Sequence, residues 1–138
     1  MMSQRLLAVS YGRSSSARQR SIDDQLAENR AAVSEHAWTL YGELSDPVSA
    51  SRYGRKIRAN WARILDLLPA VDVVVLWEPS RGDRSLSSWA AFLDACRTHG
   101  VRVHATSHNR TYDPANARDY RSLAEDGVDS VYESDRLS

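Results

Sequence analysis

Apolar positions recur along the chain with two spacings, which together predict alternating strands and helices. Short apolar or alternating runs predict four strands, at residues 5–11, 38–45, 71–77 and 101–107. Helical spacing of apolar residues predicts four helices, at residues 21–38, 58–68, 85–99 and 116–137. This order is typical of an α/β fold with an open, mostly parallel sheet of about four to five strands flanked by helices.

Local signals support these predicted elements. Ser21 and Asp24 form an S-x-x-D start signal for the first helix, whose expected apolar face is Ile22, Leu26, Val33 and Ala37. The second helix is expected to bury Trp61, Ile64, Leu65 and Leu68 and to end at Pro69. The third is expected to bury Leu86, Trp89, Leu93 and Cys96 and to stop at Gly100. The β-branched run "VDVVVLW" predicts a central strand buried on both faces, and "RTYDPANA" predicts a loop.

Composition narrows the class of protein. With 138 residues, 42% hydrophobic and 26% charged, the chain is expected to form one soluble domain over residues 1–138. No apolar run has the length of a membrane span, so no membrane partner is expected. The single cysteine, Cys96, cannot form an internal disulfide and favours a reducing, cytoplasmic location. The net charge is zero, but residues 47–65 contain five basic residues and no acid.

Three loops that follow predicted strands carry the candidate chemistry. In open parallel sheets, ligands meet the loops at the carboxyl ends of the strands. The first loop, "GRSSSARQRS", combines serines with arginines, the second is basic, and the third is "EPSRGDR". The four histidines lie elsewhere, which argues against a Ser-His-Asp triad, and His104 with His108 is too small a set for a metal site.

Serine hydroxyls among arginines indicate phosphate chemistry. Fixed guanidinium groups can stabilise the charge that develops on phosphoryl oxygens in the place of a metal ion. They can also lower the pKa of a neighbouring hydroxyl. The alternative is a solvated basic rim in which the serines serve as caps and turns.

Four linked segments resemble the catalytic domain of the serine recombinases, the resolvase/invertase and large serine integrase family. They are "YGRSS", "SIDDQ", "SDPVSAS" with "RANW", and "VDVVVLWEPSRGDR", in the family order over nearly the whole chain. The pairing of "WEPSRGDR" with "HNRTYDP" is more similar to the large integrase and transposase branch.

The resemblance implies roles for particular residues. The signature Y-x-R-x-S falls on Tyr11, Arg13 and Ser15, so Ser15 is the implied nucleophile and Arg13 an activating, phosphate-binding residue. The other implied catalytic residues are Gln19, Gln25, Asp46, Arg58, Arg81 and Arg84. The residues implied to bind DNA phosphates are Tyr11, Ser49, Arg52, Arg55, Lys56 and Ser80. The chain departs from the family at Ala59, where a proline is common, at Ser80, where small resolvases have aspartate, and by an extra residue before "SIDDQ".

The resemblance also implies a reaction and partners. The expected reaction is site-specific DNA recombination through a 5′-phosphoserine intermediate, with neither cofactor nor metal. The expected partners are DNA and further copies of the chain, as a dimer and a synaptic tetramer, in the cytoplasm and at the nucleoid. The chain stops at "VYESDRLS", without a DNA-recognition domain, so we expect a fragment of a longer recombinase or a truncated gene product, inactive alone.

Two other functions remain open from the sequence. One is a non-catalytic recombinase-like α/β module used for assembly or regulation. The presence together of Ser15 and the four arginines Arg13, Arg58, Arg81 and Arg84 argues against it. The other is a phosphate-binding flavodoxin-like domain, which would require a phosphate loop richer in glycine.

Overall fold

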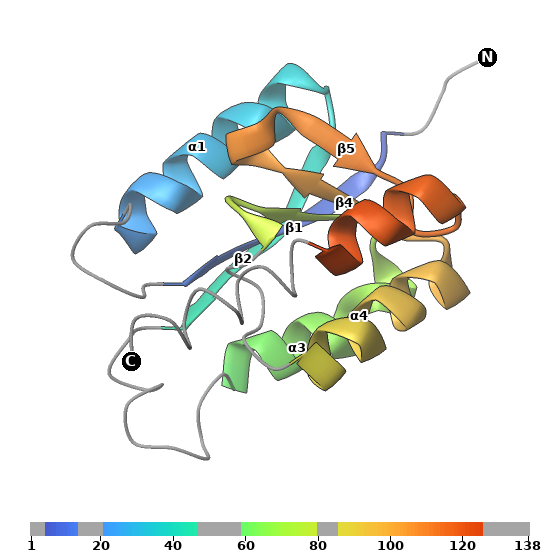
Figure 1. Ribbon diagram of the computed structural model, residues 1–138. Helices are drawn as coiled ribbons and strands as arrows, with labels where there is room; N and C mark the ends of the chain where they lie inside the picture. Colours follow the sequence, from blue (N-terminus) through green and yellow to red (C-terminus); the bar gives the residue numbers. More distant parts are fainter. Residues whose placement is uncertain (1–4, 14–20, 47–58, 80–85, 126–138) are drawn as a thin grey trace.

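A five-stranded sheet forms the centre of the described chain (Figure 1). The computed structural model describes residues 5–13, 21–46, 59–79 and 86–125. Its strands lie in the order β2-β1-β3-β4-β5 and are β1 (Leu7–Arg13), β2 (Thr39–Asp46), β3 (Val73–Leu76), β4 (Arg102–Ala105) and β5 (Arg110–Tyr112). The first four are parallel and β5 pairs antiparallel with β4. The predicted open, mostly parallel sheet is confirmed.

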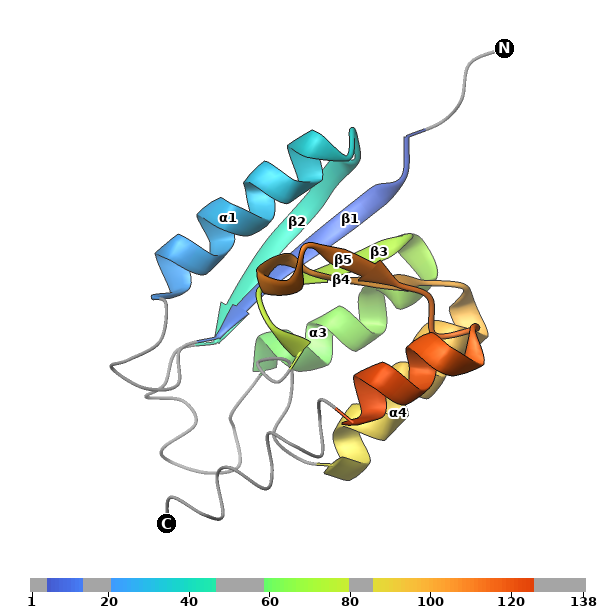
Figure 2. The ribbon, with the colours of Figure 1, turned by 45° about the horizontal axis from the view of Figure 1, so that its top comes forward.

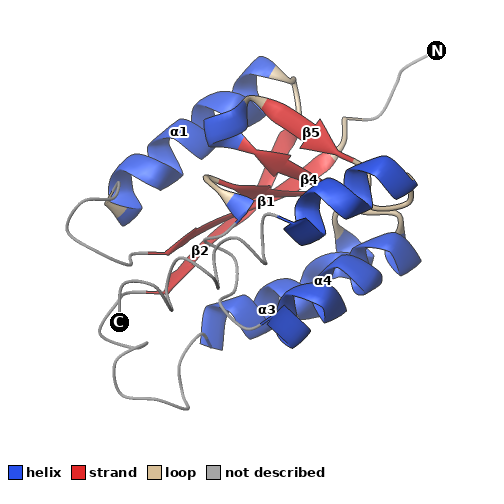
Figure 3. Cartoon of the chain, in the orientation of Figure 1, coloured by secondary structure: helices blue, strands red, loops and turns tan. Residues whose placement is uncertain are grey.

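Helices cover both faces of this sheet (Figures 2 and 3). The helical elements are α1 (Ile22–Glu35), α3 (Ala59–Leu67), the 3-10 turn η1 (Leu68–Ala70), α4 (Leu86–His99), the 3-10 turn η3 (Thr106–His108) and a helix described over residues 117–125. The helix α1 lies on one face, whereas α3, α4 and the helix at 117–125 lie on the other (Figure 2).

The strand β3 lies at the centre of the core, as its β-branched run predicts. Every residue from Val73 to Leu76 is fully buried, because β1 and β4 flank the strand and helices cover both faces. Alternate residues of β3 point to opposite faces. Val73 and Val75 join the smaller cluster with Val33 of α1, whereas Val74 and Leu76 join the larger cluster under α3 and α4.

The first helix begins where the sequence predicts and ends three residues earlier. Ser21 caps α1, and its Oγ accepts a hydrogen bond from Asp24 N at 3.1 Å. At the other end Ala37 adopts a left-handed φ of 57°, and Trp38 N donates to Val33 O at 3.0 Å. This arrangement closes the helix and turns the chain into β2. Ala37 is therefore outside the helix and exposed, so its predicted place on the buried face was wrong.

Two further details of the sequence pattern were also wrong. Leu65, expected in the core, is 38% exposed on α3, while its neighbours Trp61 and Ile64 are buried. The segment predicted as the loop "RTYDPANA" begins with the strand β5. Asn109 takes a left-handed φ of 52° and reverses the chain, so that Arg110–Tyr112 pairs with β4. A three-residue edge strand is too short to show a period.

Candidate active site

The carboxyl ends of β1 and β2 form the described part of the candidate site. In the register of these two strands Arg13 lies opposite Asp46, so both strands end level with each other. Tyr11 and Gln25 complete the predicted site residues that lie within the described chain. The sheet and α1 bring all four together.

Asp46 connects β2 to β1 and to the start of α3. Its carboxylate accepts a hydrogen bond from the Tyr11 hydroxyl at 2.6 Å, from Trp61 N at 2.9 Å and from Asn60 N at 3.2 Å. The backbone N–H groups of a first helical turn have no partner within the helix, and their partial positive charge favours an anion. Asp46 thus caps α3 from a neighbouring strand. Its described contacts give it a positioning role.

The Tyr11 ring makes the same connection through packing. It is buried and lies 5.0 Å from the Trp61 ring, centroid to centroid, in a tilted arrangement. The Trp61 ring in turn lies 4.7 Å from the Phe92 ring of α4, centroid to centroid. The end of β1 is therefore attached to α3 and α4 by an aromatic chain as well as by the Asp46 carboxylate.

Gln25 holds the last residue of β1 from the other face of the sheet. Its Oε1 accepts from Arg13 N at 3.1 Å and its Nε2 donates to Arg13 O at 2.9 Å. Gly12 permits this close approach of α1, because a Cβ at that position would lie 3.3 Å from Leu26 Cδ2. The side-chain amide satisfies both backbone groups of Arg13, as a neighbouring strand would.

Arg13 is buried to 1% exposure at the carboxyl end of β1, where its backbone pairs with Asp46 of β2. A guanidinium in such a place is costly unless anionic groups compensate its charge. A fixed, partly desolvated guanidinium interacts more strongly with an anion than a solvated one does. This position suits Arg13 to contact phosphate two residues before Ser15.

The remaining predicted site residues lie outside the described residues. They are Ser15 and Gln19 in 14–20; Ser49, Arg52, Arg55, Lys56 and Arg58 in 47–58; and Ser80, Arg81 and Arg84 in 80–85. The described chain leads into these segments after Arg13 of β1, after Asp46 of β2 and three residues beyond Leu76 of β3. All three segments therefore begin at the same edge of the sheet, the carboxyl end of its parallel strands.

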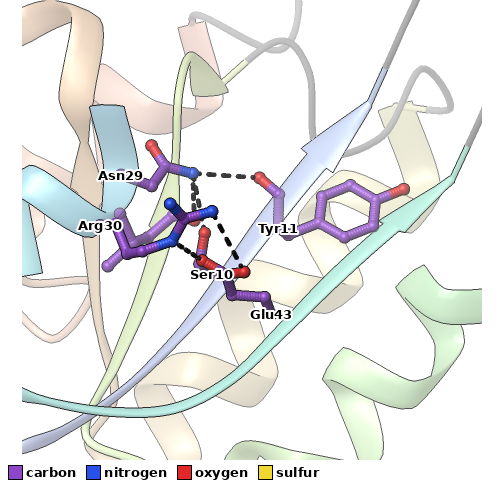
Figure 4. A network of polar contacts seen from close by, with 6 residues as sticks. Ser10, Tyr11, Asn29, Arg30 and Glu43 are labelled. Atoms are coloured by element: carbon purple, nitrogen blue, oxygen red, sulfur yellow. Dashed lines mark hydrogen bonds and ion pairs between the residues drawn. The ribbon is translucent and has the colours of Figure 1, made fainter. Parts of the chain in front are cut away.

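Sequence reasoning missed two polar residues of this region, Asn29 and Asn60. Asn29 is fully buried on α1 and contacts the strands (Figure 4), and Asn60 Nδ2 donates to Ser45 O at 2.7 Å beside the α3 cap. Asn29 follows Gln25 by four residues, so both lie on one helix face. Two amide side chains at this spacing, among the apolar residues of the helix, were the sequence signal that could have identified Asn29 as a buried polar residue.

Other titratable groups lie within the core. Burial raises the pKa of the Cys96 thiol well above its usual range, and the predicted role of Cys96 as a small core residue is confirmed.

Within the described residues, no group of three or more His, Cys, Asp or Glu side chains could hold a metal ion. No helix in the described ranges is long and apolar enough to cross a membrane.

Comparisons with known proteins identify relatives at the level of family and fold. The family model "Resolvase, N terminal domain" matches residues 8–129. A comparison with curated proteins gives no match.

Solved structures share the fold at low sequence identity. The N-terminal catalytic domain of TP901-1 integrase has a TM-score of 0.66 and 17% identity, with 96% of this chain and 99% of that chain covered. A resolvase family site-specific recombinase from Streptococcus pneumoniae has a TM-score of 0.67 and 17% identity, with 96% and 91% covered. The C-terminal catalytic domain of ISC1926 TnpA, an IS607-like serine recombinase, has a TM-score of 0.61 and 21% identity, with 73% and 67% covered.

Proposed function

Because the chain belongs to the resolvase family, whose N-terminal domain it matches over residues 8–129, we propose that it is the catalytic domain of a site-specific DNA recombinase with Ser15 as the nucleophile. One observation carries this proposal beyond the family match. Tyr11, Arg13, Gln25 and Asp46 are all buried near the carboxyl ends of β1 and β2, where hydrogen bonds join Tyr11 to Asp46 and Gln25 to the backbone of Arg13. Arg13 precedes Ser15 by two residues.

The proposed reaction proceeds in two transfers of one phosphoryl group. Ser15 Oγ attacks a DNA phosphorus, forming an Oγ–P bond while the bond from phosphorus to the 3′ oxygen breaks. The serine proton is lost and the departing 3′ oxygen gains one, which leaves a 3′-OH and a 5′-phosphoserine. A 3′-OH from the partner duplex then reverses these steps, so the bond energy is conserved in the intermediate.

Arginines carry the charge stabilisation in this proposal. Arg13, Arg58, Arg81 and Arg84 surround the reacting phosphate, and the last three belong to the segments that begin at the site edge. Guanidinium groups make bidentate contacts to phosphoryl oxygens, and their preorganised charge favours the transition state. Ser49, Arg52, Arg55, Lys56 and Ser80 bind flanking phosphates.

In this proposal the described residues hold the elements that lead into these groups. Asp46 and Tyr11 fix the start of α3, which directly follows Arg58 in the chain. Gln25 fixes Arg13, which precedes Ser15 by two residues. Strand exchange requires DNA and further copies of the chain, as a dimer and a synaptic tetramer, at the nucleoid in the cytoplasm.

A covalent adduct tests the proposal. The full-length protein that contains this domain is incubated with sheared genomic DNA of its source organism, and the reaction is stopped with detergent. DNA linked to the protein is captured through a tag and sequenced, and the linked residue is identified by mapping the phosphopeptide. We expect the adduct on Ser15 and its loss in Ser15→Ala. Arg81→Ala and Arg84→Ala should each lower its rate about 100-fold or more, as expected for a transition-state donor.

Neighbouring serines provide matched controls. Ser14→Ala and Ser16→Ala should keep adduct formation, because Ser15 alone fits Y-x-R-x-S, and a chelator should have no effect. An adduct that persists in Ser15→Ala, or that depends on Mg²⁺, would overturn the mechanism. A full-length protein that forms no adduct would support the alternative of a non-catalytic module.

A further inference from the structure

A buried amide joins β1, β3 and η3 near the candidate site, and Figure 4 shows its contacts with β1. Asn29 of α1 is fully buried, and its Nδ2 donates to Ser10 Oγ at 3.0 Å. Longer contacts of 3.4 Å lead from the same nitrogen to Tyr11 O of β1 and Val75 O of β3. On the opposite side of the amide, the Thr106 hydroxyl donates to Asn29 Oδ1 at 2.7 Å.

The chemistry of the partners determines the orientation of this amide. Carbonyl oxygens only accept hydrogen bonds, so the amide nitrogen must face Tyr11 O and Val75 O. The amide oxygen therefore faces Thr106, whose hydroxyl must donate. Replacement by an apolar side chain would leave Ser10 and Thr106 without these partners.

The contacts of Asn29 lie close to where the chain leaves the sheet. Tyr11 is two residues from the end of β1, Val75 is one residue from the end of β3, and Thr106 directly follows β4. The link between β3 and η3 is reinforced by Ser107 N, which donates to Trp77 O at 2.7 Å. One side chain thus couples the strand that leads to Ser15 with the strand that leads to Arg81 and Arg84.

Gln25 and Asn29 bind neighbouring parts of β1 from consecutive turns of α1. Gln25 binds the backbone of Arg13, and Asn29 binds Ser10 and the backbone of Tyr11. Gln25 contacts β1 in these hydrogen bonds, whereas Asn29 also reaches β3 and η3. Asn29 is therefore placed to set the distance between the β1 end and the β3 end.

From these contacts we infer that Asn29, held by Thr106, is a positioning residue for cleavage, which aligns the end of β1, the strand that leads to Ser15, with the end of β3, the strand that leads to Arg81 and Arg84. The inference rests on the proposed function. Small errors in the placement of reacting groups cost large factors in rate. Loss of this coupling should thus lower the rate of the chemical step more than it lowers DNA affinity.

The test compares variants of equal stability. The substrate is a short duplex carrying the site captured from genomic DNA in the adduct experiment, and adduct formation is timed at saturating duplex. Asn29→Leu should form adduct at least about tenfold more slowly, with its affinity for the duplex changed by less than about twofold. Val33→Ala, one turn further along the same helix and in the buried cluster of Ala8, Val73 and Val75, removes apolar packing but keeps the hydrogen bonds of Asn29, and is the control for lost stability.

A second pair of variants changes only the Thr106 side chain, so that a single hydrogen bond is lost in one variant and kept in the other. Both variants are expected to fold normally. Thr106→Val removes the donor to Asn29 Oδ1 at nearly constant shape and should also slow adduct formation. Thr106→Ser restores the hydroxyl and should recover most of that rate. In the double variant with Asn29→Leu, Thr106→Val should add little further loss.

The outcomes separate the two proposals. Adduct formation in Asn29→Leu at the rate of Val33→Ala, or equal rates in Thr106→Val and Thr106→Ser, would overturn the inference and leave the proposed function intact. Absence of adduct in the unaltered chain would overturn both. Slow Asn29→Leu and Thr106→Val, with Val33→Ala and Thr106→Ser near the unaltered rate, would support the inference.

Discussion

Gln25 and Asn29 occupy helix positions where an amphipathic pattern would place aliphatic side chains. Both are fully buried, and each uses its amide to bind backbone groups of β1 near the end of the strand. A buried backbone group without a partner is costly, so these amides select one arrangement of α1 on the sheet. The position of β1 at the candidate site is thus held by two neutral side chains, Gln25 and Asn29.

Replacement of Gln25 should be costly for this reason. Gln25→Leu leaves Arg13 N–H and C=O without their side-chain partners, so the free energy of unfolding should fall by about 2 to 4 kcal/mol. Urea unfolding followed by circular dichroism measures this change. Ser34→Ala, at an exposed position of the same helix, should stay within about 0.5 kcal/mol, and an equal loss in both variants would contradict the role of Gln25.

The element α3 begins on a carboxylate that another element supplies. Asp46 of β2 accepts from the first-turn N–H groups of Asn60 and Trp61, and the hydroxyl of Tyr11 in β1 completes its contacts. Three elements therefore share one anion at the edge where the candidate site lies. Movement of any one of them changes the start of α3, which follows Arg58.

Removal of the Tyr11 hydroxyl tests this shared contact. Tyr11→Phe keeps the ring packed against Trp61 but removes the donor to Asp46, so the free energy of unfolding should fall by about 1.5 to 3 kcal/mol, as for a hydrogen bond to a charged group. The measurement is again urea unfolding. Tyr41→Phe on β2 is the matched control, since Tyr41 is 49% exposed, and it should change stability by less than about 0.5 kcal/mol. Equal effects of the two variants would show that the bond to Asp46 is unimportant.

At the scale of the whole molecule, packing of α1 and the sheet buries one histidine, His104, on the α1 face. His104 of β4 is buried, its ring lies 4.9 Å from the His36 ring and 5.5 Å from the Trp38 ring, and its Nδ1 is 2.8 Å from Thr111 Oγ1. Burial, with a smaller contribution from His36, lowers the pKa of His104 to about 4. The folded protein therefore keeps this ring neutral under mildly acidic conditions.

Stability of the whole chain should therefore depend on pH. Between the ordinary histidine pKa of about 6.5 and the folded value of about 4, the unfolded chain binds a proton at His104 that the folded chain does not. The free energy of unfolding should be unaffected by this group above pH about 6.5, fall as the pH decreases towards about 4, and change no further below it. The loss should be at most about 3 kcal/mol.

Urea unfolding between pH 4 and 8 checks this dependence. His104→Asn, which keeps a polar atom near Thr111, should flatten the curve in this window. His99→Gln, at an exposed position of α4, should leave the curve unchanged. A curve of the same shape in His104→Asn would assign the dependence to other groups.

The sequence by itself determined the order of the four parallel strands and of the helices that follow them, the central strand and the family. The spacing of apolar residues is a local property of the chain. The continuous apolar run "VDVVVLW" is stable as a strand only where both faces of the sheet are covered. The motifs around Tyr11 and Arg13 are likewise defined by residue types at short spacings, which can be recognised without a structure. The family prediction made from them is confirmed by the match over residues 8–129. The roles of Ser15 and the arginines of the three loops stay predictions, because these residues lie outside the described ranges.

Only the tertiary structure decided which polar residues are buried and what they bind. Asn29 and Thr106 are 77 positions apart, and no local period relates them. The end of α1 at Glu35, the exposure of Leu65 and the pairing of β5 with β4 were likewise set by neighbouring elements. Asp46, predicted from the resemblance alone, received its contacts with Tyr11 and α3 from the packing of three elements, since a carboxylate binds donors only where the fold brings them.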